Sequence, residues 1–486
     1  MARLSDLVEE ARLSARALKD YGDGLFNPTV RLGVTGLSRA GKTVFITALV
    51  HGLTRGGRFP VFESLATGRI ARARLAPQPD DDVPRFAYEE HLRTLVEERR
   101  WPNSTVDISE LRLVIDYQRN NGAERTLTLD IVDYPGEWLL DLPLLNKSFE
   151  EWSAESLMLA RAAPRAELAG DFLAHLAALD PNAPADEQAT LIAAKLFTDY
   201  LRACRDDRFA MSLLPPGRFL MPGNLAGSPA LTFAPLDLPD GSAPDGSLWA
   251  MMRRRYEAYK DVVVRPYFRD HFSRLDRQIV LVDALSAFNA GPEALHDLEA
   301  AMAGILDCFR IGRSTILSSL FRPRVDRILF AATKADHLHH LSHDRLEDVL
   351  RHTVGKAVAR SELAGAAVDV VALAAVRATK EALVQHGRDK LPSIIGTPAK
   401  GELANGEAFD GETEVATFPG DLPANLDGLF EGGAFKGLST DAPDKADYRF
   451  LRFRPPRLER NGAEEPALPH IRLDRALQFL IGDRLT

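Results

Sequence analysis

The stretch VTGLSRAGKT, residues 34–43, constrains the fold of this chain more than any other segment. It follows the alternating apolar residues Val30, Leu32 and Val34 and precedes apolar residues at helical spacing, so we expect a turn between a strand and a helix. Two kinds of site use such a turn. One is the G-x-x-x-x-G-K-T loop that cradles phosphate groups. The other is the G-x-S-x-G elbow that presents a nucleophilic serine, here Ser38.

In the phosphate-binding interpretation, backbone N–H groups, an ammonium group and a hydroxyl all face the phosphates of a nucleotide. Lys42 would neutralise phosphate oxygens and serve catalysis, and Thr43 would be a Mg²⁺ ligand. The predicted nucleotide-binding residues of this loop are Gly36, Ser38, Arg39, Ala40, Gly41, Lys42, Thr43 and Val44. The elbow interpretation instead requires an acid and then a histidine farther along the chain.

Four strongly apolar segments and a weaker fifth are expected to be buried strands. They are residues 30–35, 127–132, 278–282, 327–332 and 368–375. Helical patterns lie between several of them, which indicates an α/β fold with a mostly parallel sheet covered on both faces. Asn121 and Gly122 form a hairpin signal between two alternating runs, so one antiparallel strand is expected in this sheet.

The chain is expected to divide into six segments around this sheet, because the gaps between some strands are far longer than ordinary connections. The segments are an N-terminal helix (1–25), a first part of the sheet domain with the phosphate-binding loop (26–136), a helical insertion (137–275), a second part of the sheet domain (276–395), a loop-rich insertion (396–446), and a C-terminal strand and helix (447–486).

Composition excludes several classes of protein. The 486 residues carry a net charge of −9, so no nucleic-acid partner is expected. Cys204 and Cys308 are the only cysteines, which indicates a reducing compartment. No apolar run of about 20 residues occurs that could span a bilayer. Peripheral membrane contact stays open.

The segment DIVDYPGEW places Asp133 at the carboxyl end of the second core strand. Ligands bind beyond the carboxyl ends of the strands in such sheets, so Asp133 is expected to face the same crevice as the loop after Val34. Asp133 is therefore predicted to hold Mg²⁺, and the Gly136 amide to reach the γ-phosphate of a nucleotide. The elbow interpretation leaves Lys42 and Asp133 unexplained, so phosphate binding is preferred.

Another predicted strand, ILFAA, is followed by Thr333, Lys334 and Asp336, which resemble the N/T-K-x-D motif that recognises guanine. The Asp336 carboxylate can accept both N–H donors on the Watson–Crick edge of guanine, and Lys334 can lay its aliphatic stem over the base. The alternative is a helix start in which Asp336 is a capping acid. After the fifth strand, the backbone N–H of Ala375 or Val376 would bind the guanine carbonyl.

The blocks VTGLSRAGKT, DIVDYPGEWLLDLPLL, TKADH and LPHIRLDRALQFLIGD resemble the YcjX-like family of bacterial P-loop proteins, within the broader Ras-like GTPase class. The resemblance extends over nearly the whole chain. It implies a P-loop NTPase fold of the Ras-like G-domain type, GTP or GDP and Mg²⁺ as ligands, a cytoplasmic location and a link to stress. It also suggests that Thr105 is the switch-one threonine that senses Mg²⁺ and the γ-phosphate, with Thr67 as a rival.

One residue departs from the Ras-like pattern. Glu137 stands where such hydrolases often carry a glutamine that positions water, and a carboxylate beside a triphosphate adds like-charge repulsion. Slow or partner-stimulated GTP hydrolysis is therefore expected, with Lys42, Thr105 and Glu137 as the predicted catalytic residues. Arg39, or an arginine among residues 253–255, could neutralise the transition state in cis, and ordinary surface salt bridges are the alternative.

The predicted function is a nucleotide-dependent switch that contacts an unidentified protein partner through the helical insertion. Two alternatives stay open. The chain could be a guanine-nucleotide-binding scaffold that does not hydrolyse its ligand, which the Glu137 position favours. It could also be an ATP-dependent enzyme that uses the same phosphate-binding loop.

Two further patterns have ordinary structural explanations that we prefer. The histidines His337, His339, His340 and His343 could form a metal site, but an exposed helix start is the simpler interpretation. Residues 448–457, YRFLRFRPPR, interleave aromatic and basic side chains, as surfaces that bind RNA or phospholipid do. An amphipathic edge strand that ends at Pro455 is preferred.

Overall fold

The computed structural model describes most of the chain. The described residues are 28–37, 39–103, 105–307, 325–363, 365–404, 407–420, 422, 450–458 and 466–486. The predicted N-terminal helix at 1–25 lies outside them, as do Ser38, Cys308 and residues 423–446 of the predicted loop-rich insertion.

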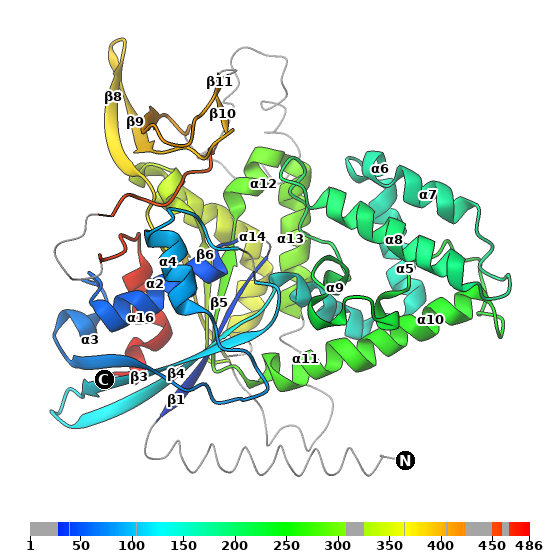
Figure 1. The fold of residues 1–486 in the computed structure, drawn as a ribbon, viewed down its shortest axis with the longest axis horizontal. Coiled ribbons are helices and arrows are strands. Elements are labelled where there is room, and N and C mark those ends of the chain that lie inside the picture. The colour runs from blue at the N-terminus through cyan, green and yellow to red at the C-terminus, as the bar shows by residue number, and fades with distance from the viewer. Residues whose placement is uncertain are drawn as a thin grey trace.

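A seven-stranded sheet forms the centre of the fold, with the strand order β2-β3-β4-β1-β5-β6-β7 (Figure 1). The strands are β1 (Thr29–Gly36), β2 (Ile70–Ala76), β3 (Ser109–Gln118), β4 (Glu124–Asp133), β5 (Arg277–Val282), β6 (Arg327–Ala332) and β7 (Ala367–Ala372). In this sheet β3 runs against the other strands, because it pairs antiparallel with both β2 and β4 while the remaining pairs are parallel. The predicted sheet with one antiparallel strand is confirmed.

Two details of the sheet differ from the prediction. The sequence pattern does not reveal β2, because Arg72 and Arg74 alternate with alanine and leave almost no apolar periodicity. The fifth predicted strand, 368–375, is too long, since β7 ends at Ala372. Beyond it, Ala374 leaves the sheet and forms an isolated antiparallel bridge with Ile471.

Helices cover both faces of the sheet, as near-continuous apolar strands require. The helices are α2 (Lys42–Arg55), α3 (Glu63–Ala66), α4 (Tyr88–Val96), α5 (Phe149–Arg161), α6 (Arg165–Leu168), α7 (Gly170–Ala177), α8 (Glu187–Cys204), α9 (Gly217–Leu220), α10 (Leu248–Tyr259), α11 (Arg265–Asp270), α12 (Ala284–Ala290), α13 (Pro292–Asp307), α14 (His343–Leu363) and α16 (Leu473–Ile481). On one face α2 packs on β1 and β4, and α16 packs on β5 and β6. On the other face α14 packs on β6 and β7, with α13 against it.

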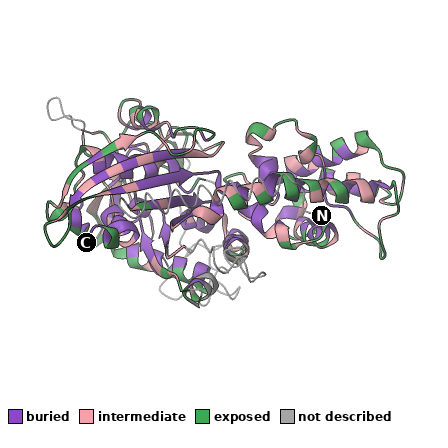
Figure 2. Cartoon of the chain, turned by 90° about the horizontal axis from the view of Figure 1, so that it is seen from below, coloured by how far each residue is buried: buried purple, intermediate pink, exposed green. Residues whose placement is uncertain are grey.

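The helices α5 to α11 form a lobe beside the sheet, as Figures 1 and 2 show. Aromatic side chains fill this lobe; the rings of Trp152 and Tyr256 stack with centroids 5.1 Å apart. The same buried cluster continues into the sheet domain through Val282 and Phe330, so the lobe and the sheet share one core. In the part of the chain that the structure describes, no helix has both the length and the apolar character needed to cross a bilayer.

The late part of the chain contains more regular structure than its composition suggests. β8 (Lys380–His386), β9 (Asp389–Gly396) and β12 (Val415–Thr417) form a three-stranded sheet, and β10 (Leu403–Ala404) pairs with β11 (Glu407–Ala408). The β8–β9 hairpin projects from the α/β core at the upper left of Figure 1.

The predicted edge strand before Pro455 is wrong. The described residues 450–458 contain no strand, and Phe453 forms only an isolated bridge with Pro398. Phe450 joins the core shared with the helical lobe, whereas Leu451 and Phe453 join a separate small cluster, so the segment is buried on both sides and is not amphipathic. Its backbone pairs with residues 397–399 through a single bridge, which is too short for a strand.

A buried ion pair ties the helical lobe to the sheet domain. The Arg165 guanidinium, at the start of α6, bonds the Asp297 carboxylate of α13 and donates to the Leu213 carbonyl at 2.9 Å. The other Asp297 oxygen accepts from the Leu213 amide at 2.7 Å. Both side chains are almost inaccessible, at 5% and 7% exposure, so each charge depends on the other.

We expect Arg165→Met to lower the free energy of unfolding by about 3–5 kcal/mol, because it leaves the Asp297 charge buried without its partner. Urea denaturation followed by circular dichroism measures this loss.

Arg161→Met is the matched control. Arg161 pairs with Asp237 at the surface, where both side chains are more than half exposed. An exposed pair contributes less than about 1 kcal/mol, so equal losses from the two variants would contradict the assignment.

Candidate phosphate-binding site

The parallel sheet brings the predicted site residues to one edge. Val34, the residue before the loop, is in register with Asp133 on the adjacent strand β4. Thr333 follows β6 at the same edge, and its amide donates to the Val282 carbonyl at the end of β5 at 2.9 Å. The carboxyl ends of β1, β4 and β6 thus meet at one crevice, the usual ligand position in such sheets.

The loop after β1 has the backbone that a phosphate cradle requires. Gly36 has a φ of +152°, and a Cβ there would lie 2.5 Å from the Leu281 carbonyl oxygen. Gly41 has a φ of +83° and caps the N-terminus of α2. Lys42 is buried, and its ammonium group donates to the Gly36 carbonyl at 3.0 Å, across the loop. The partial positive charge of the α2 N-terminus adds to that of Lys42.

The remaining described residues of the loop also help to form the turn between β1 and α2. The Ala40 amide donates to the Leu37 carbonyl at 3.2 Å, and Val44 is half-buried in the first turn of α2. Arg39 stands at the loop tip with a φ of +63° and pairs with Asp207, which follows α8 in the helical lobe. Arg39 is therefore already bonded to the lobe.

Two hydroxyl groups and a carboxylate converge beside Lys42. The Thr105 hydroxyl donates to Asp133 Oδ2 at 2.7 Å and lies 3.3 Å from the Thr43 hydroxyl. Asp133 Oδ1 is buried and has no hydrogen-bond partner among the described residues. Burial raises the pKa of Asp133 to about 6, although Lys42 and the Thr105 hydroxyl act in the opposite direction. These oxygen donors fit a hard divalent cation such as Mg²⁺.

Thr67, the rival of Thr105, lies in another setting. It is exposed at the end of α3, where its hydroxyl donates to the Glu63 carbonyl at 2.7 Å. The geometry therefore brings Thr105, and not Thr67, to Thr43 and Asp133.

Gly136 lies directly against the phosphate-binding loop. A Cβ at Gly136 would be 1.6 Å from the Gly36 carbonyl oxygen and 3.1 Å from the Leu37 Cα. The next residue, Glu137, is buried and forms an ion pair with Arg205, whose guanidinium is 3.1 Å away. Arg205 follows α8, so an arginine of the helical lobe reaches the residue that departs from the Ras-like pattern.

The segment after Gly136, η1 (Gly136–Asn146), is held by the lobe at several points. A Cβ at Gly217 of α9 would be 1.8 Å from the Glu137 carbonyl oxygen, so the two backbones touch. Asp141 accepts from the Gly217 amide at 2.7 Å and from the Tyr259 hydroxyl at 2.6 Å. Burial raises the pKa of Asp141 to about 6, opposed by these donors. No motif marks these residues in the sequence.

The predicted base-recognition residues form a tight turn. Lys334 has a φ of +61°, and its ammonium group pairs with Asp283, which follows β5. Burial disfavours the Asp283 carboxylate, but Lys334 and Ser286 outweigh burial and hold its pKa below the usual value. Asp336 is buried, and its Oδ2 accepts from the Ala378 amide at 2.7 Å. The carboxylate is therefore oriented by the loop that follows β7.

Ala375 and Val376 lie in that loop between two anchored residues. The Ala374 amide donates to the Ile471 carbonyl at 3.1 Å, and the Arg377 amide donates to the Pro469 carbonyl at 2.7 Å. The C-terminal segment thus fixes the loop that faces Asp336. The sequence offers no signal for this anchoring.

The arginines at 253–255 make their bonds inside the helical lobe. Arg253 lies 3.8 Å from Glu150, and Arg255 donates to the Thr232 carbonyl at 3.0 Å. Arg205, which the sequence analysis missed, is the arginine of the lobe that contacts Glu137. It borders a cavity of about 60 Å³ whose walls also include Arg39 and Asp283.

The histidines of the DHLHHLSH segment separate in the structure. His343 Nε2 bonds the Ala335 carbonyl at 2.9 Å, and His337 is buried against Phe453. His339, His340 and Glu381 do lie together, but Glu381 already bonds His340 at 2.7 Å and Arg377 at 3.3 Å. His339 and His343 do not share a helix, since α14 begins only at His343.

In this structure a glycine-rich loop joins a strand to a helix, lysine and threonine follow it, and an aspartate on the adjacent strand faces it. This arrangement defines the P-loop class of nucleotide-binding α/β proteins, and the sheet here is Ras-like. The chain belongs to the YcjX-like family, DUF463, whose model matches residues 30–485. It is 37% identical over 498 residues to the Ras-like GTPase YcjX of Escherichia coli, covering 97% of this chain and 100% of that protein. It is 34% identical over 489 residues to the Ras-like GTPase YcjX of Shewanella oneidensis, covering 94% of each. The resemblance seen in the sequence is confirmed.

We expect Gly136→Ala to lower the free energy of unfolding by about 1–3 kcal/mol, because the new methyl group must push the backbone away from Gly36. Thermal unfolding of the purified protein measures the change.

Gly355→Ala provides the control, since a Cβ at this position of α14 meets nothing within 4 Å. Alanine is the better helix former, so this variant should be as stable as the parent or more so. If both variants unfold at the parental temperature, the close approach of Gly136 and Gly36 is refuted.

Proposed function

We propose that this chain binds GTP and GDP, hydrolyses GTP slowly or with the help of a partner, and acts in the cytoplasm as a nucleotide-dependent switch. The observation that carries the proposal is the convergence of Lys42, Thr43, Thr105 and Asp133 at the edge where β1 and β4 end. The names of the two relatives, both Ras-like GTPases, support the same activity.

The phosphate groups would lie in the loop from Gly36 to Val44, with the amide groups and Lys42 as donors. Thr43 and Asp133 would hold Mg²⁺, with Thr105 as its third contact. When bound, Mg²⁺ neutralises charge on the phosphate oxygens. Gly136 would offer its amide to the γ-phosphate, because it already touches the loop at Gly36.

The base would lie between the turn at 333–336 and the loop after β7. Asp336 would accept the N–H donors of guanine, with Thr333 and Lys334 shaping the turn. The amides of Ala375 and Val376 would face the guanine carbonyl. The bond from the Ala378 amide to Asp336 supports this arrangement, because it orients the carboxylate before a base arrives.

The switch would couple the γ-phosphate to the helical lobe. Thr105 and Gly136 would respond to the phosphate, and Gly136 is followed directly by η1, which α9 and α10 hold through Gly217 and Tyr259. A shift of η1 would therefore move the lobe. A protein partner that binds the lobe would sense the nucleotide in this way.

One observation favours a second function, a guanine-nucleotide scaffold without turnover. Glu137 is a carboxylate and not an uncharged glutamine, and it is already paired with Arg205, so it is poorly suited to position a water molecule. In the first function, the same pair would place the Arg205 charge near the γ-phosphate. Turnover of the parent and of an Arg205 variant distinguishes the two.

Calorimetric titration tests nucleotide binding. We expect GDP and GTP to bind, and ATP to bind at least about 100-fold more weakly, because Asp336 would be left without its donors. Lys42→Ala should weaken GDP binding at least about tenfold by removing a charged phosphate donor.

Lys195→Ala is the control for Lys42, since Lys195 is a 75% exposed side chain on α8. Asp336→Asn should shift preference from guanine to xanthine nucleotides, whose carbonyl can accept from the new amide. Equal binding of ATP and GTP would instead identify an ATP-dependent enzyme, and no binding of any nucleotide would end the proposal.

We expect Arg205→Ala to lower the GTP turnover number by about 10–100-fold while GDP affinity changes little, because the lost charge would act on the transition state. Phosphate release under single-turnover conditions and GDP titration measure the two quantities.

Arg202→Ala is the matched control, since Arg202 is a half-exposed arginine in the last turn of α8, just before Arg205. Arg205→Lys should restore part of the turnover, since lysine keeps the charge without the planar guanidinium. Unchanged turnover in Arg205→Ala would remove this arginine from the mechanism, and a parent protein without turnover would favour the scaffold.

A further inference from the structure

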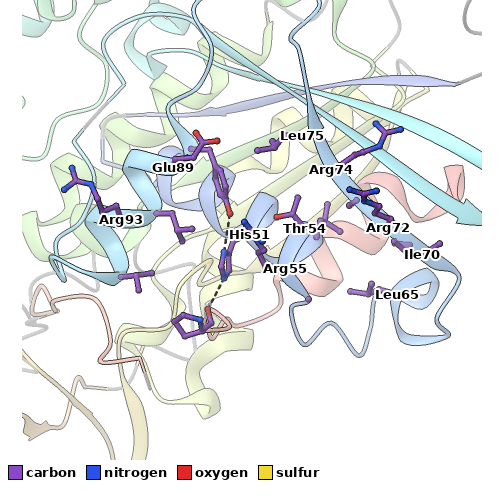
Figure 3. Close-up of a pocket in the computed structure, with 18 of the residues that line it drawn as sticks. His51, Thr54, Arg55, Leu65, Ile70, Arg72, Arg74, Leu75, Glu89 and Arg93 are labelled. Atoms are coloured by element: carbon purple, nitrogen blue, oxygen red, sulfur yellow. Dashed lines mark hydrogen bonds between the residues drawn. The ribbon is translucent and has the colours of Figure 1, made fainter. Parts of the chain in front are cut away.

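A large groove lies beside the exposed edge of the central sheet, away from the phosphate-binding loop. Its volume is about 720 Å³, and its walls come from β2, α4 and the C-terminal half of α2 (Figure 3). Among the described residues, β2 is the terminal strand of the sheet and pairs on one side only, with β3. No residue of the candidate nucleotide site lines this groove.

The floor of the groove is apolar and firmly built. Leu65, Leu75, Leu92 and Val96 are half-buried and pack against the core beneath. At one end the buried His51 bridges two elements: its ring nitrogens lie 3.2 Å from the Tyr88 hydroxyl and 2.9 Å from the Pro466 carbonyl. Apolar surface that stays accessible in such a groove is available to a ligand.

The rim of the groove is basic in a protein whose net charge is −9. Four exposed arginines line it, whereas the lining acids are Glu89 and Glu97. The arginines are Arg55, Arg72, Arg74 and Arg93. Glu89 is already neutralised, because Arg85 donates two bonds of 2.7 Å to its carboxylate.

Two of the rim arginines form ion pairs that are exposed to solvent. Arg74 lies 3.9 Å from Asp116, and Arg93 lies 3.1 Å from Glu98, with both arginine side chains about half exposed. Among the described residues no ion pair involves Arg72. Exposed pairs of this kind exchange readily for a better placed anion.

We propose that this groove binds an extended acidic segment of a protein partner, which adds to the edge of β2 as an eighth strand. The backbone of the segment would pair with the outer N–H and C=O groups of β2. Side chains alternate along a strand, so apolar residues would enter the groove while glutamate or aspartate residues meet the arginines. The proposal does not depend on nucleotide binding or turnover.

The test uses a fluorescein-labelled peptide that alternates glutamate with valine, titrated with the full-length protein and followed by fluorescence anisotropy. The peptide should bind, and its affinity should fall as salt is added. The double variant Arg72→Glu/Arg74→Glu should bind at least about tenfold more weakly. A peptide with lysine in place of glutamate should not bind.

The matched control is Arg253→Glu/Arg254→Glu, which reverses two charges on α10, outside the groove. It should bind the acidic peptide like the parent. Circular dichroism verifies that each variant is folded. If the two double variants weaken binding equally, the arginines of the groove are not the binding site.

Methylation of alternate peptide amides tests the strand pairing itself. One phase of N-methylation should abolish binding and the other should be tolerated, because every second amide of an added strand faces β2. Equal effects of both phases would overturn the pairing. Vesicles of phosphatidylcholine and phosphatidylserine in equal parts test the other occupant. If the peptide does not bind and the vesicles bind in a way that depends on the arginines, the groove meets a membrane surface and the proposal is overturned.

Discussion

A carboxylate, Asp133, and an ammonium group, Lys42, are both buried where β1 and β4 end, and the charge of each influences the other. Asp133 is 2% exposed and Lys42 is 8% exposed, so water screens neither charge well. Burial raises the pKa of Asp133, while Lys42 and the Thr105 hydroxyl act to lower this pKa because they favour the ionised carboxylate. The parallel register of Val34 with Asp133 places this carboxylate beside the loop that carries Lys42. A slip of one residue would turn Asp133 to the other face of the sheet.

The helical lobe is an extension of this site and not an appended module. The lobe begins at Gly136, which contacts Gly36. Its residues Arg205 and Gly217 contact Glu137, and its Tyr259 bonds Asp141. Its aromatic core is continuous with one face of the sheet. Densely packed cores transmit strain, which supports the proposed coupling between Gly136 and the lobe.

The sequence predicts the parts of the fold that depend on local pattern. The strand–loop–helix at Val34 to Thr43 and the acid at Asp133 could be predicted, because phosphate and Mg²⁺ binding require glycine, lysine and aspartate at such positions. β2 could not be predicted, because Arg72 and Arg74 leave this strand without a clear alternation of apolar and polar residues. The Arg205–Glu137 pair joins residues far apart in the chain, and no local pattern encodes such a contact. The edge strand predicted before Pro455 fails for a related reason, because the segment pairs with distant residues 397–399 through a single bridge that no local pattern encodes.

The predicted base-recognition turn is linked to the C-terminal end of the region that the family model matches, which extends to residue 485. The loop after β7 is held by backbone bonds to Ile471 and Pro469, and Asp336 is oriented by that same loop. Arg472 then bonds Glu347 of α14, which itself accepts from the Ala372 amide at the end of β7 at 3.0 Å. Residues 469–472 therefore act on Asp336 through the β7 loop, although they lie far from it in sequence. In the proposed base site, selectivity would depend on how firmly the Asp336 carboxylate is held, and therefore on the C-terminal segment as much as on the turn itself.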